Sequence, residues 1–278
     1  MGSVFSPYYA WALGRDPATA AEDHCAINVC LYGPSARRWT MTERGRRQVQ
    51  RSAREFRVGP SGVRWDGTAL TIDLDEIGMP LPQRVRGRLR VFPRALTDFT
   101  TPLDQGGRHR WGPIAPCSRI EVELEDPALR WSGEAYVDSN EGDVLIDHDF
   151  VSWDWSRATL RDGGSAVLYD LRPSSGQPHV VARRFHADGR HEAFDVPPAQ
   201  ALARTPLWRV ARSMRSEGAA SVRVRQGLED TPFYSRSLLE AQLCGEPVTA
   251  VHESLDVQRL VSLPVRLMLP WRMPRRAG

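Results

Sequence analysis

The feature that most constrains this chain is an alternation of apolar and polar residues over short segments that end at glycine, proline or aspartate. The alternation is strictest in Arg119–Glu125, where every second residue is apolar and one face of an extended strand becomes hydrophobic. Val63–Trp65 and Ala69–Leu74 flank Asp66-Gly67, a dipeptide typical of tight hairpin turns. Periodicity of the helical kind is scarce, so the pattern predicts an all-β protein.

Segments of this kind recur along most of the chain. The expected strands are residues 26–32, 38–42, 63–65, 69–74, 85–92, 119–125, 131–138, 165–171, 179–185, 207–214 and 221–225. So many strands exceed one small barrel, which indicates two β units. The best linker is the turn-rich stretch between Pro93 and Gly107, and we therefore expect one domain over residues 1–100 and another over residues 101–278.

Two segments depart from the strand pattern. Thr42–Phe56 predicts a short surface helix, although Gly45 weakens it. Leu255–Leu269 predicts a helix near the carboxyl end that begins at Ser254 or Asp256.

Composition excludes several classes of protein. All 37 basic residues are arginine and the net charge is only +3, so no strong field favours nucleic acid. The four cysteines lack metal-site or disulfide-framework spacing. The uncharged run before Arg15 is too short to span a membrane and lacks the basic start of a signal peptide. We therefore expect a cytoplasmic protein.

Cofactor and metal motifs are missing from the sequence. It contains no G-x-G-x-x-G, no phosphate-binding loop and no G-x-S-x-G. His252–Asp256 imitates a zinc-protease motif, but Asp256 stands where the second histidine is required. The arginines of Arg84–Arg90 alternate as on a solvated strand face. We expect no cofactor and no bound metal.

Two short segments place polar and aromatic residues on the same strand face. His109 and Trp111 are two residues apart, and so are Tyr136 and Asp138. If both faces turn inward, they bring an acid, an imidazole and two aromatic rings into one interior. Pattern alone also allows a plainer interpretation, in which the rings belong to the core and Asp138 opens a turn.

Several segments, in order over nearly the whole chain, make it resemble the acyclic carotenoid 1,2-hydratases, also called hydroxyneurosporene synthases. They are Gly2–Ala12, His24–Val29, Trp39–Gly45, Trp65–Gly67, Asp149–Ser156 (DFVSWDWS), Arg204–Trp208, Glu229–Tyr234 and Val251–Leu255. The resemblance implies two lipocalin-like β-barrel or sandwich units packed together, with a short C-terminal helix. It implies addition of water across the terminal C1=C2 double bond of carotenoids such as neurosporene or lycopene, in the synthesis of spheroidene- and spirilloxanthin-type carotenoids of photosynthesis.

The family's site residues form a His-x-Trp and a Tyr-x-Asp pair, which match His109, Trp111, Tyr136 and Asp138 at all four positions. An alkene is a poor base, so hydration requires a strong acid, and burial would keep Asp138 protonated for that task. Trp111 and Tyr136 would stabilise the tertiary carbocation with their ring faces. His109 would either orient the acid or take a proton from the attacking water. Such a hydratase needs no cofactor.

Other interpretations remain open at this stage. The chain could be a non-catalytic carrier of carotenoids or other lipids, an isoprenoid isomerase or cyclase, or a β-rich interaction module. Reserve candidates for the acid are Asp149, Asp154 and Asp170. The substrate lies in membranes, so Leu267–Arg276 either docks at the surface of a photosynthetic membrane or packs as an ordinary terminal helix. The sequence does not determine the oligomeric state.

Overall fold

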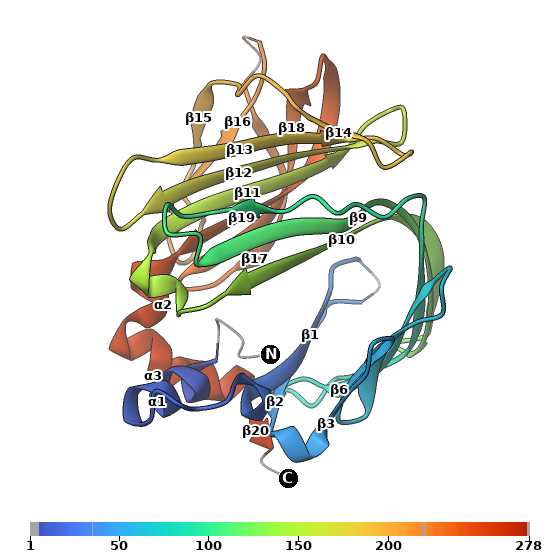
Figure 1. Ribbon diagram of the computed structural model, residues 1–278, viewed down its shortest axis with the longest axis vertical. Coiled ribbons are helices and arrows are strands. Elements are labelled where there is room, and N and C mark those ends of the chain that lie inside the picture. Colours follow the sequence, from blue (N-terminus) through green and yellow to red (C-terminus); the bar gives the residue numbers. More distant parts are fainter. Residues whose placement is uncertain (1–5, 35, 219–220, 277–278) are drawn as a thin grey trace. The chain divides into compact units, whose positions relative to one another are not determined.

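The computed structural model describes residues 6–34, 36–218 and 221–276, so residues 2–5 of the first family-like segment lie outside the described residues. Among these residues strands dominate, and helices are few and short (Figure 1). The predicted all-β class with a short C-terminal helix is confirmed.

The chain folds into two compact units that are not contiguous in sequence. Unit 1 holds the residues up to Pro93, Arg119–Gly133 and the residues from Arg266 on. Unit 2 holds Arg94–Ser118 and Glu134–Val265. Two long strands, β9 (His109–Asp126) and β10 (Leu129–Gly142), contribute to both. The division into residues 1–100 and 101–278 as folding domains stays a prediction.

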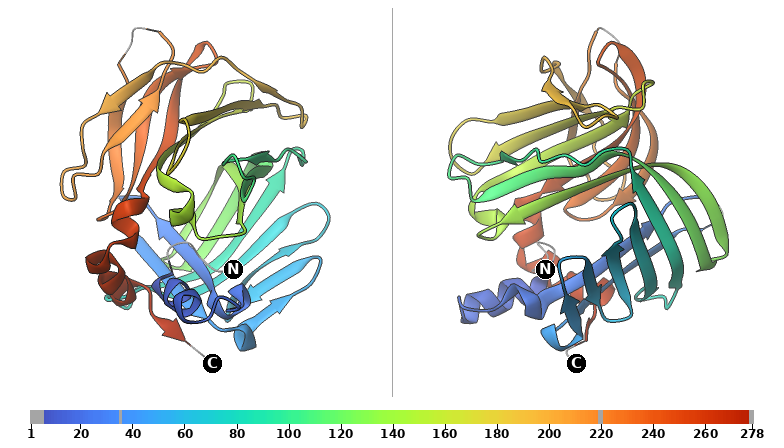
Figure 2. Two further views of the ribbon diagram at one scale, coloured as in Figure 1. Left: turned by 60° about the vertical axis from the view of Figure 1, so that its left-hand side comes forward. Right: turned by 45° about the vertical axis from the view of Figure 1, so that its right-hand side comes forward.

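Unit 1 is built around a meander in which β3 to β7 pair antiparallel in chain order, coloured blue to cyan in Figure 2. Its elements are α1 (Pro7–Arg15), η1 (Ala21–His24), β1 (Cys25–Leu31), β2 (Arg38–Arg44), η2 (Arg46–Gln48), β3 (Val49–Arg51), β4 (Glu55–Val58), β5 (Ser61–Trp65), β6 (Leu70–Ile77), β7 (Arg84–Pro93), most of α3 (Leu263–Arg272) and β20 (Arg275–Arg276). The meander continues through β9 to β10, while β1, β2 and β20 form a separate small sheet.

The core of unit 1 lies on the apolar face of the meander. Leu74, Val85, Val122 and Leu124 are buried there, and side chains of β1 pack against them. Gly87 in the middle of β7 has φ +147°, and a Cβ at this position would meet the Glu123 carbonyl oxygen at 2.3 Å. Only glycine allows this close approach of β7 to β9.

Unit 2 contains a seven-stranded antiparallel sheet in the order β14-β13-β12-β11-β19-β18-β17. Its elements are β8 (Thr101–Pro102), η3 (Ile146–His148), β11 (Phe150–Thr159), β12 (Ser165–Pro173), β13 (His179–Phe185), β14 (His191–Ala193), β15 (Ala199–Leu202), β16 (Arg212–Arg215), β17 (Arg223–Asp230), β18 (Tyr234–Leu243), β19 (Glu246–Asp256) and α2 (Val257–Val261). Strands β15 and β16 form a hairpin, and Met214 of β16 joins the core built on one face of the sheet.

The helix predicted over Thr42–Phe56 is wrong. Strand β2 runs to Arg44, and β3 and β4 then form a hairpin in which Val49 lies opposite Val58. The segment has no apolar stripe at helical spacing, so pairing in the meander satisfies its backbone instead.

The predicted strand 207–214 is shorter than expected. Only Arg212–Arg215 is extended, because the Asp230 carboxylate accepts the Leu207 backbone N–H at 2.8 Å and holds the residues before β16 in a turn. The predicted terminal helix begins as expected, since the Asp256 side chain caps α2 by accepting the Arg259 N–H. It is interrupted at Ser262 and resumes as α3, and Leu255 belongs to β19.

Candidate active site

Three of the four predicted site residues meet at one carboxyl group in unit 2. The Trp111 Nε1–H of β9 donates a hydrogen bond of 2.8 Å to Asp138 Oδ2 of β10. The Tyr136 hydroxyl donates to the same oxygen at 3.2 Å. The alternation predicted for both strands therefore turns these side chains to one common side. Both donors bind Oδ2, so Oδ1 is the oxygen that can carry a proton.

Burial governs the protonation of Asp138. Desolvation raises the pKa of this carboxyl above its ordinary value, and the nearby charge of Glu253 adds to the rise. The hydrogen bonds from Trp111 and Tyr136 act the other way and lower the pKa, but desolvation is the largest effect. Burial likewise raises the pKa of the Tyr136 hydroxyl, so that it remains a donor. The net effect shifts this carboxyl towards its protonated form and leaves it held by neutral donors.

His109 lies in a neighbouring ion-pair cluster. Its Nε2 is 3.0 Å from Asp149 Oδ2, and Arg108 contacts the other oxygen of that carboxylate. The His109 backbone N–H donates to Asp104 at 2.7 Å, and a Cβ on Gly142 would come within 2.9 Å of the ring. Among the residues that the structure describes, no hydrogen bond joins His109 to Asp138.

A chain of aromatic rings connects these two clusters. The ring of Trp111 lies 5.9 Å from that of Tyr169, which lies 6.1 Å from Trp153. Trp153 is 5.9 Å from Phe150, and Phe150 is 5.0 Å from His109. Each of these pairs meets edge to face, the arrangement that aromatic quadrupoles favour. The result is a continuous apolar wall that also offers π-faces to a cation.

The register of unit 2 extends the wall across the sheet. Trp155 of β11 lies opposite Tyr169 of β12 on one side and Glu253 of β19 on the other. Glu253 in turn lies opposite Arg236 of β18. Directly opposite residues share a sheet face, so these four side chains form one row. The Trp155 ring is 5.6 Å from Tyr136, which brings the row to the acid.

Sequence reasoning missed Tyr169, Trp155 and Glu253 as site residues. The period-two pair of Trp153 and Trp155 was a usable signal, because it puts two indoles on one face of a strand. Glu253 lies inside the segment set aside as an imitation of a zinc motif. No local pattern indicates that it faces Trp155.

The reserve acids occupy other surroundings. Asp170 is paired with Arg215 at 2.5 Å, and Asp149 with Arg108 and His109. Asp154 is buried and its pKa is raised by burial, but it alternates with Trp153 and Trp155 and so lies on the opposite face of the sheet. There it accepts hydrogen bonds from Ser213 and Ser254 rather than facing aromatic rings.

His252 belongs to the same polar cluster as Asp154. It is fully buried between Ser156, 2.8 Å from its Nδ1, and Ser254, 3.1 Å from its Nε2. Desolvation, followed by the charge of Arg212, lowers its pKa to about 3, so it is neutral at physiological pH. Within the described ranges no group of three or more His, Cys, Asp or Glu side chains is arranged to hold a metal ion.

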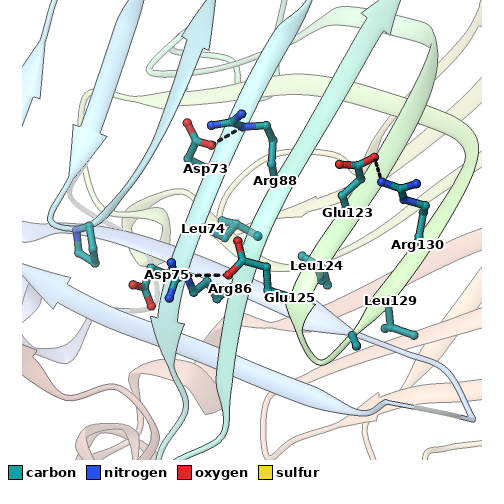
Figure 3. A pocket seen from close by; sticks show the side chains of 13 residues that line it. Asp73, Leu74, Asp75, Arg86, Arg88, Glu123, Leu124, Glu125, Leu129 and Arg130 are labelled. Atoms are coloured by element: carbon teal, nitrogen blue, oxygen red, sulfur yellow. Dashed lines mark hydrogen bonds and ion pairs between the residues drawn. The ribbon is translucent and has the colours of Figure 1, made fainter.

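Unit 1 contains a hollow of about 780 Å³ over β6, β7, β9 and β10 (Figure 3). Ion pairs form much of its lining and join Arg88 to Asp73 at 2.6 Å and Arg130 to Glu123 at 2.6 Å. The predicted solvated face of Arg84–Arg90 is confirmed here, because its arginines are exposed. Such a surface does not suit a long hydrocarbon.

The predicted docking segment falls largely on α3. Leu267, Met268 and Trp271 are exposed there, Trp271 by 73%. Arg272 stacks on the Trp39 ring at 4.2 Å, and Arg275 contacts Glu43. Among the described residues, no helix combines the length and hydrophobicity that crossing a membrane requires.

Comparison of the sequence with known proteins identifies a family. The model of the family "Carotenoid hydratase CrtC" matches residues 1–278. The chain is 59% identical over its whole length to the acyclic carotenoid 1,2-hydratase of Rubrivivax gelatinosus, of which it covers 68%. It is 38% identical, again over its whole length, to the enzyme of the same name from Cereibacter sphaeroides, of which it covers 97%.

A solved structure supports the fold. The crystal structure of an AttH protein from Nitrosomonas europaea superposes with a TM-score of 0.56 over 78% of this chain and 75% of that one, at 12% identity. This likeness bears on the lipocalin-like fold alone. The family model matches the whole chain, and the relatives are 59% and 38% identical to it over its full length. The chain therefore belongs to the carotenoid hydratase family CrtC.

Proposed function

We propose that this protein adds water across the terminal C1=C2 double bond of an acyclic carotenoid such as neurosporene or lycopene, with Asp138 as the proton donor. The observation that carries the proposal is the partly buried Asp138 carboxyl, whose Oδ2 is held by Trp111 and Tyr136 beside a wall of aromatic rings. The names of the family relatives support the same reaction.

The reaction follows from the state of this carboxyl. Asp138 transfers its proton to C2, the less substituted carbon, and the π-electron pair becomes the new C–H bond. A tertiary carbocation is left on C1, beside rings whose π-faces stabilise it by about 2 kcal/mol each when water is excluded. Water then forms the C1–O bond and loses a proton, which gives a tertiary alcohol. No step needs a cofactor.

In this proposal His109 takes no direct part in the proton transfer. Its ring is fixed by Asp149 and packs on Phe150, so it shapes the end of the aromatic wall. It is a positioning residue for the polyene rather than the partner of the acid.

The test is anaerobic incubation of purified protein with lycopene or neurosporene, followed by chromatography and mass analysis. Wild-type protein should give a product heavier by one water, and Asp138→Asn should give none. Asp143→Asn is the matched control, because Asp143 is an exposed carboxylate paired with Arg110. Binding of the carotenoid without any product would instead favour the carrier, and a product of unchanged mass would favour an isomerase or cyclase.

The proposed location is cytoplasmic, with α3 touching the membrane that holds the substrate. The exposed side chains of Leu267 and Trp271 would enter the interface. Removing residues 267–278 is a poor test, because it deletes Arg275, the ion-pair partner of the buried Glu43. The better variant is the double change Leu267→Ser and Trp271→Ser, which should reduce co-sedimentation with vesicles of anionic and zwitterionic phospholipid. Leu81→Ser, at an equally exposed position in a turn of unit 1, should not.

A further inference from the structure

A second carboxylate faces the proposed acid from another part of the sheet. Glu253 of β19 lies directly opposite Trp155, and the Trp155 ring contacts Tyr136, whose hydroxyl binds Asp138. Glu253 thus stands one aromatic side chain away from the Tyr136–Asp138 pair. Neither the aromatic wall nor the proposed role of Asp138 as the acid explains why a charged side chain, Glu253, lies at this position.

Arg236 forms an ion pair with Glu253. The guanidinium Nε donates to Glu253 Oε1 at 2.9 Å, and Nη2 lies 2.7 Å from the same oxygen. The two side chains are about a quarter exposed, at 25% and 23%, so water can reach them. Because both contacts are to Oε1, the pair leaves Oε2 as the oxygen to meet an incoming molecule.

Trp155 supplies the second observation. Its Nε1–H is buried and has no hydrogen-bond partner among the described residues. A buried N–H of this kind is rarely left unpaired in a native protein, and the acceptor that fits beside a carboxylate is the oxygen of a water or an alcohol. A donor without a partner among the described residues and a partly exposed carboxylate, at opposite positions of neighbouring strands, are two polar groups that can hold a bound water.

We infer that Trp155 and Glu253 hold the water that attacks the carbocation, with Trp155 Nε1–H donating to its oxygen and Glu253 Oε2 accepting one of its protons. This inference rests on the proposed hydration. The water oxygen forms the C1–O bond with its lone pair, and the proton that it loses passes to Glu253. Solvent then removes that proton and returns one to Asp138, so the cycle consumes one water and one alkene.

In this inference Asp138 gives a proton and Glu253 accepts one, and their hydrogen-bond partners differ accordingly. Asp138 accepts hydrogen bonds from two neutral donors, whereas Glu253 is paired with a cation. The charge of Glu253 raises the pKa of Asp138 as well, but it is a smaller effect than desolvation, so Asp138 can still donate its proton when Glu253 is replaced. The Arg236 contacts also make Glu253 a weaker nucleophile, which disfavours capture of the carbocation as an ester. An oxonium ion is a strong acid, so an ordinary carboxylate suffices as its base.

The experiment separates protonation of the alkene from capture of water by running the reaction in D₂O. In Glu253→Gln, alcohol formation should fall about 100-fold or more, in the range of a lost general base. The carbocation should still form and revert, so the recovered carotenoid should carry deuterium at C2. Trp155→Phe keeps the ring and loses the N–H, and should lower alcohol formation about tenfold with the same exchange retained.

The matched control is Glu240→Gln on β18, which breaks a similar pair with Arg223 away from the aromatic wall. It should leave both alcohol formation and exchange unchanged. Near-ultraviolet circular dichroism checks the fold of each variant, and Trp155→Phe tests the water site independently if Glu253→Gln does not fold.

Three results would overturn the inference. The first is a rate of alcohol formation in both Glu253→Gln and Trp155→Phe that equals the wild-type rate. Another is loss of deuterium exchange together with alcohol in the folded variants, which would make Glu253 and Trp155 part of the protonation step. The third is failure of the wild-type protein itself to form alcohol, which removes the proposed hydration and the water site with it; in that case no variant needs to be compared.

Discussion

The two units bury charged side chains in opposite ways. In unit 1 the fully buried Glu76 accepts hydrogen bonds from Arg44 at 2.8 Å and Ser61 at 2.6 Å. Buried Glu43 is likewise matched by Arg275, and its Oε1 lies 2.8 Å from the ring of His24. In unit 2 the Asp138 carboxyl is held only by neutral donors. A carboxylate that is buried with a cation joins strands through an ion pair, whereas burial without a cation raises the pKa of a carboxyl and favours the form that can give a proton away.

The unit 1 pairs therefore have a structural explanation. Glu43 and Glu76 connect the ends of the chain and the meander to β2, because Arg275 lies in β20 and Arg44 follows Glu43. Removing one member of such a pair leaves the other charge buried without a partner, which is strongly destabilising. Their substitution should change stability, while substitution of Asp138 should change chemistry.

Asp138→Asn should have the largest effect. Loss of the acid should lower the rate of hydration by a factor of about 10² to 10⁴, measured as kcat/KM with lycopene. The same change should not destabilise the protein at neutral pH. A group whose pKa is raised on folding contributes stability that is complete below its unfolded pKa and is lost as the pH rises through its folded pKa. Urea denaturation of both proteins at pH 4 and pH 8 measures this. The unfolding free energy of the wild type, relative to that of the variant, should be higher at pH 4 than at pH 8.

Arg44→Met should have a comparably large effect, but on stability rather than on the rate of hydration. It leaves Glu76 buried without its cation and should cost about 3–5 kcal/mol of unfolding free energy in urea denaturation. The fraction that remains folded should keep its kcat. A large loss of kcat in well-folded protein would contradict the distinction between the two units.

Tyr136→Phe should sharpen the account of the acid with a smaller effect. The hydroxyl lowers the pKa of Asp138, so its removal should raise that pKa further. Hydration needs protonated Asp138, and the fall in kcat/KM with rising pH should therefore move to higher pH in the variant. A shift to lower pH would mean that Tyr136 does not stabilise the ionised form.

Asp73→Asn, in the charged hollow of unit 1, should have the smallest effect. It removes an exposed ion pair with Arg88, whose attraction water screens, and should leave the unfolding free energy in urea denaturation nearly unchanged. Activity with lycopene should be unchanged. Reduced activity would implicate the hollow in function and would require a second site on unit 1.

What the sequence determined by itself is the local part of the molecule. Alternation predicted the strands and the shared faces of His109 with Trp111 and of Tyr136 with Asp138, because side-chain direction in a strand depends only on position along it. Asp256 was correctly placed among the possible starts of the terminal helix, because a cap acts within one turn.

Tertiary structure decided what lies across the strands. It paired His109 with Asp149, put Asp154 on the opposite face of the sheet from Trp155, and set Trp155 between Tyr169 and Glu253. These outcomes depend on the register of strands from distant parts of the chain. Register is determined by the burial of whole sheet faces, and a shift of one residue would exchange every side chain between the faces.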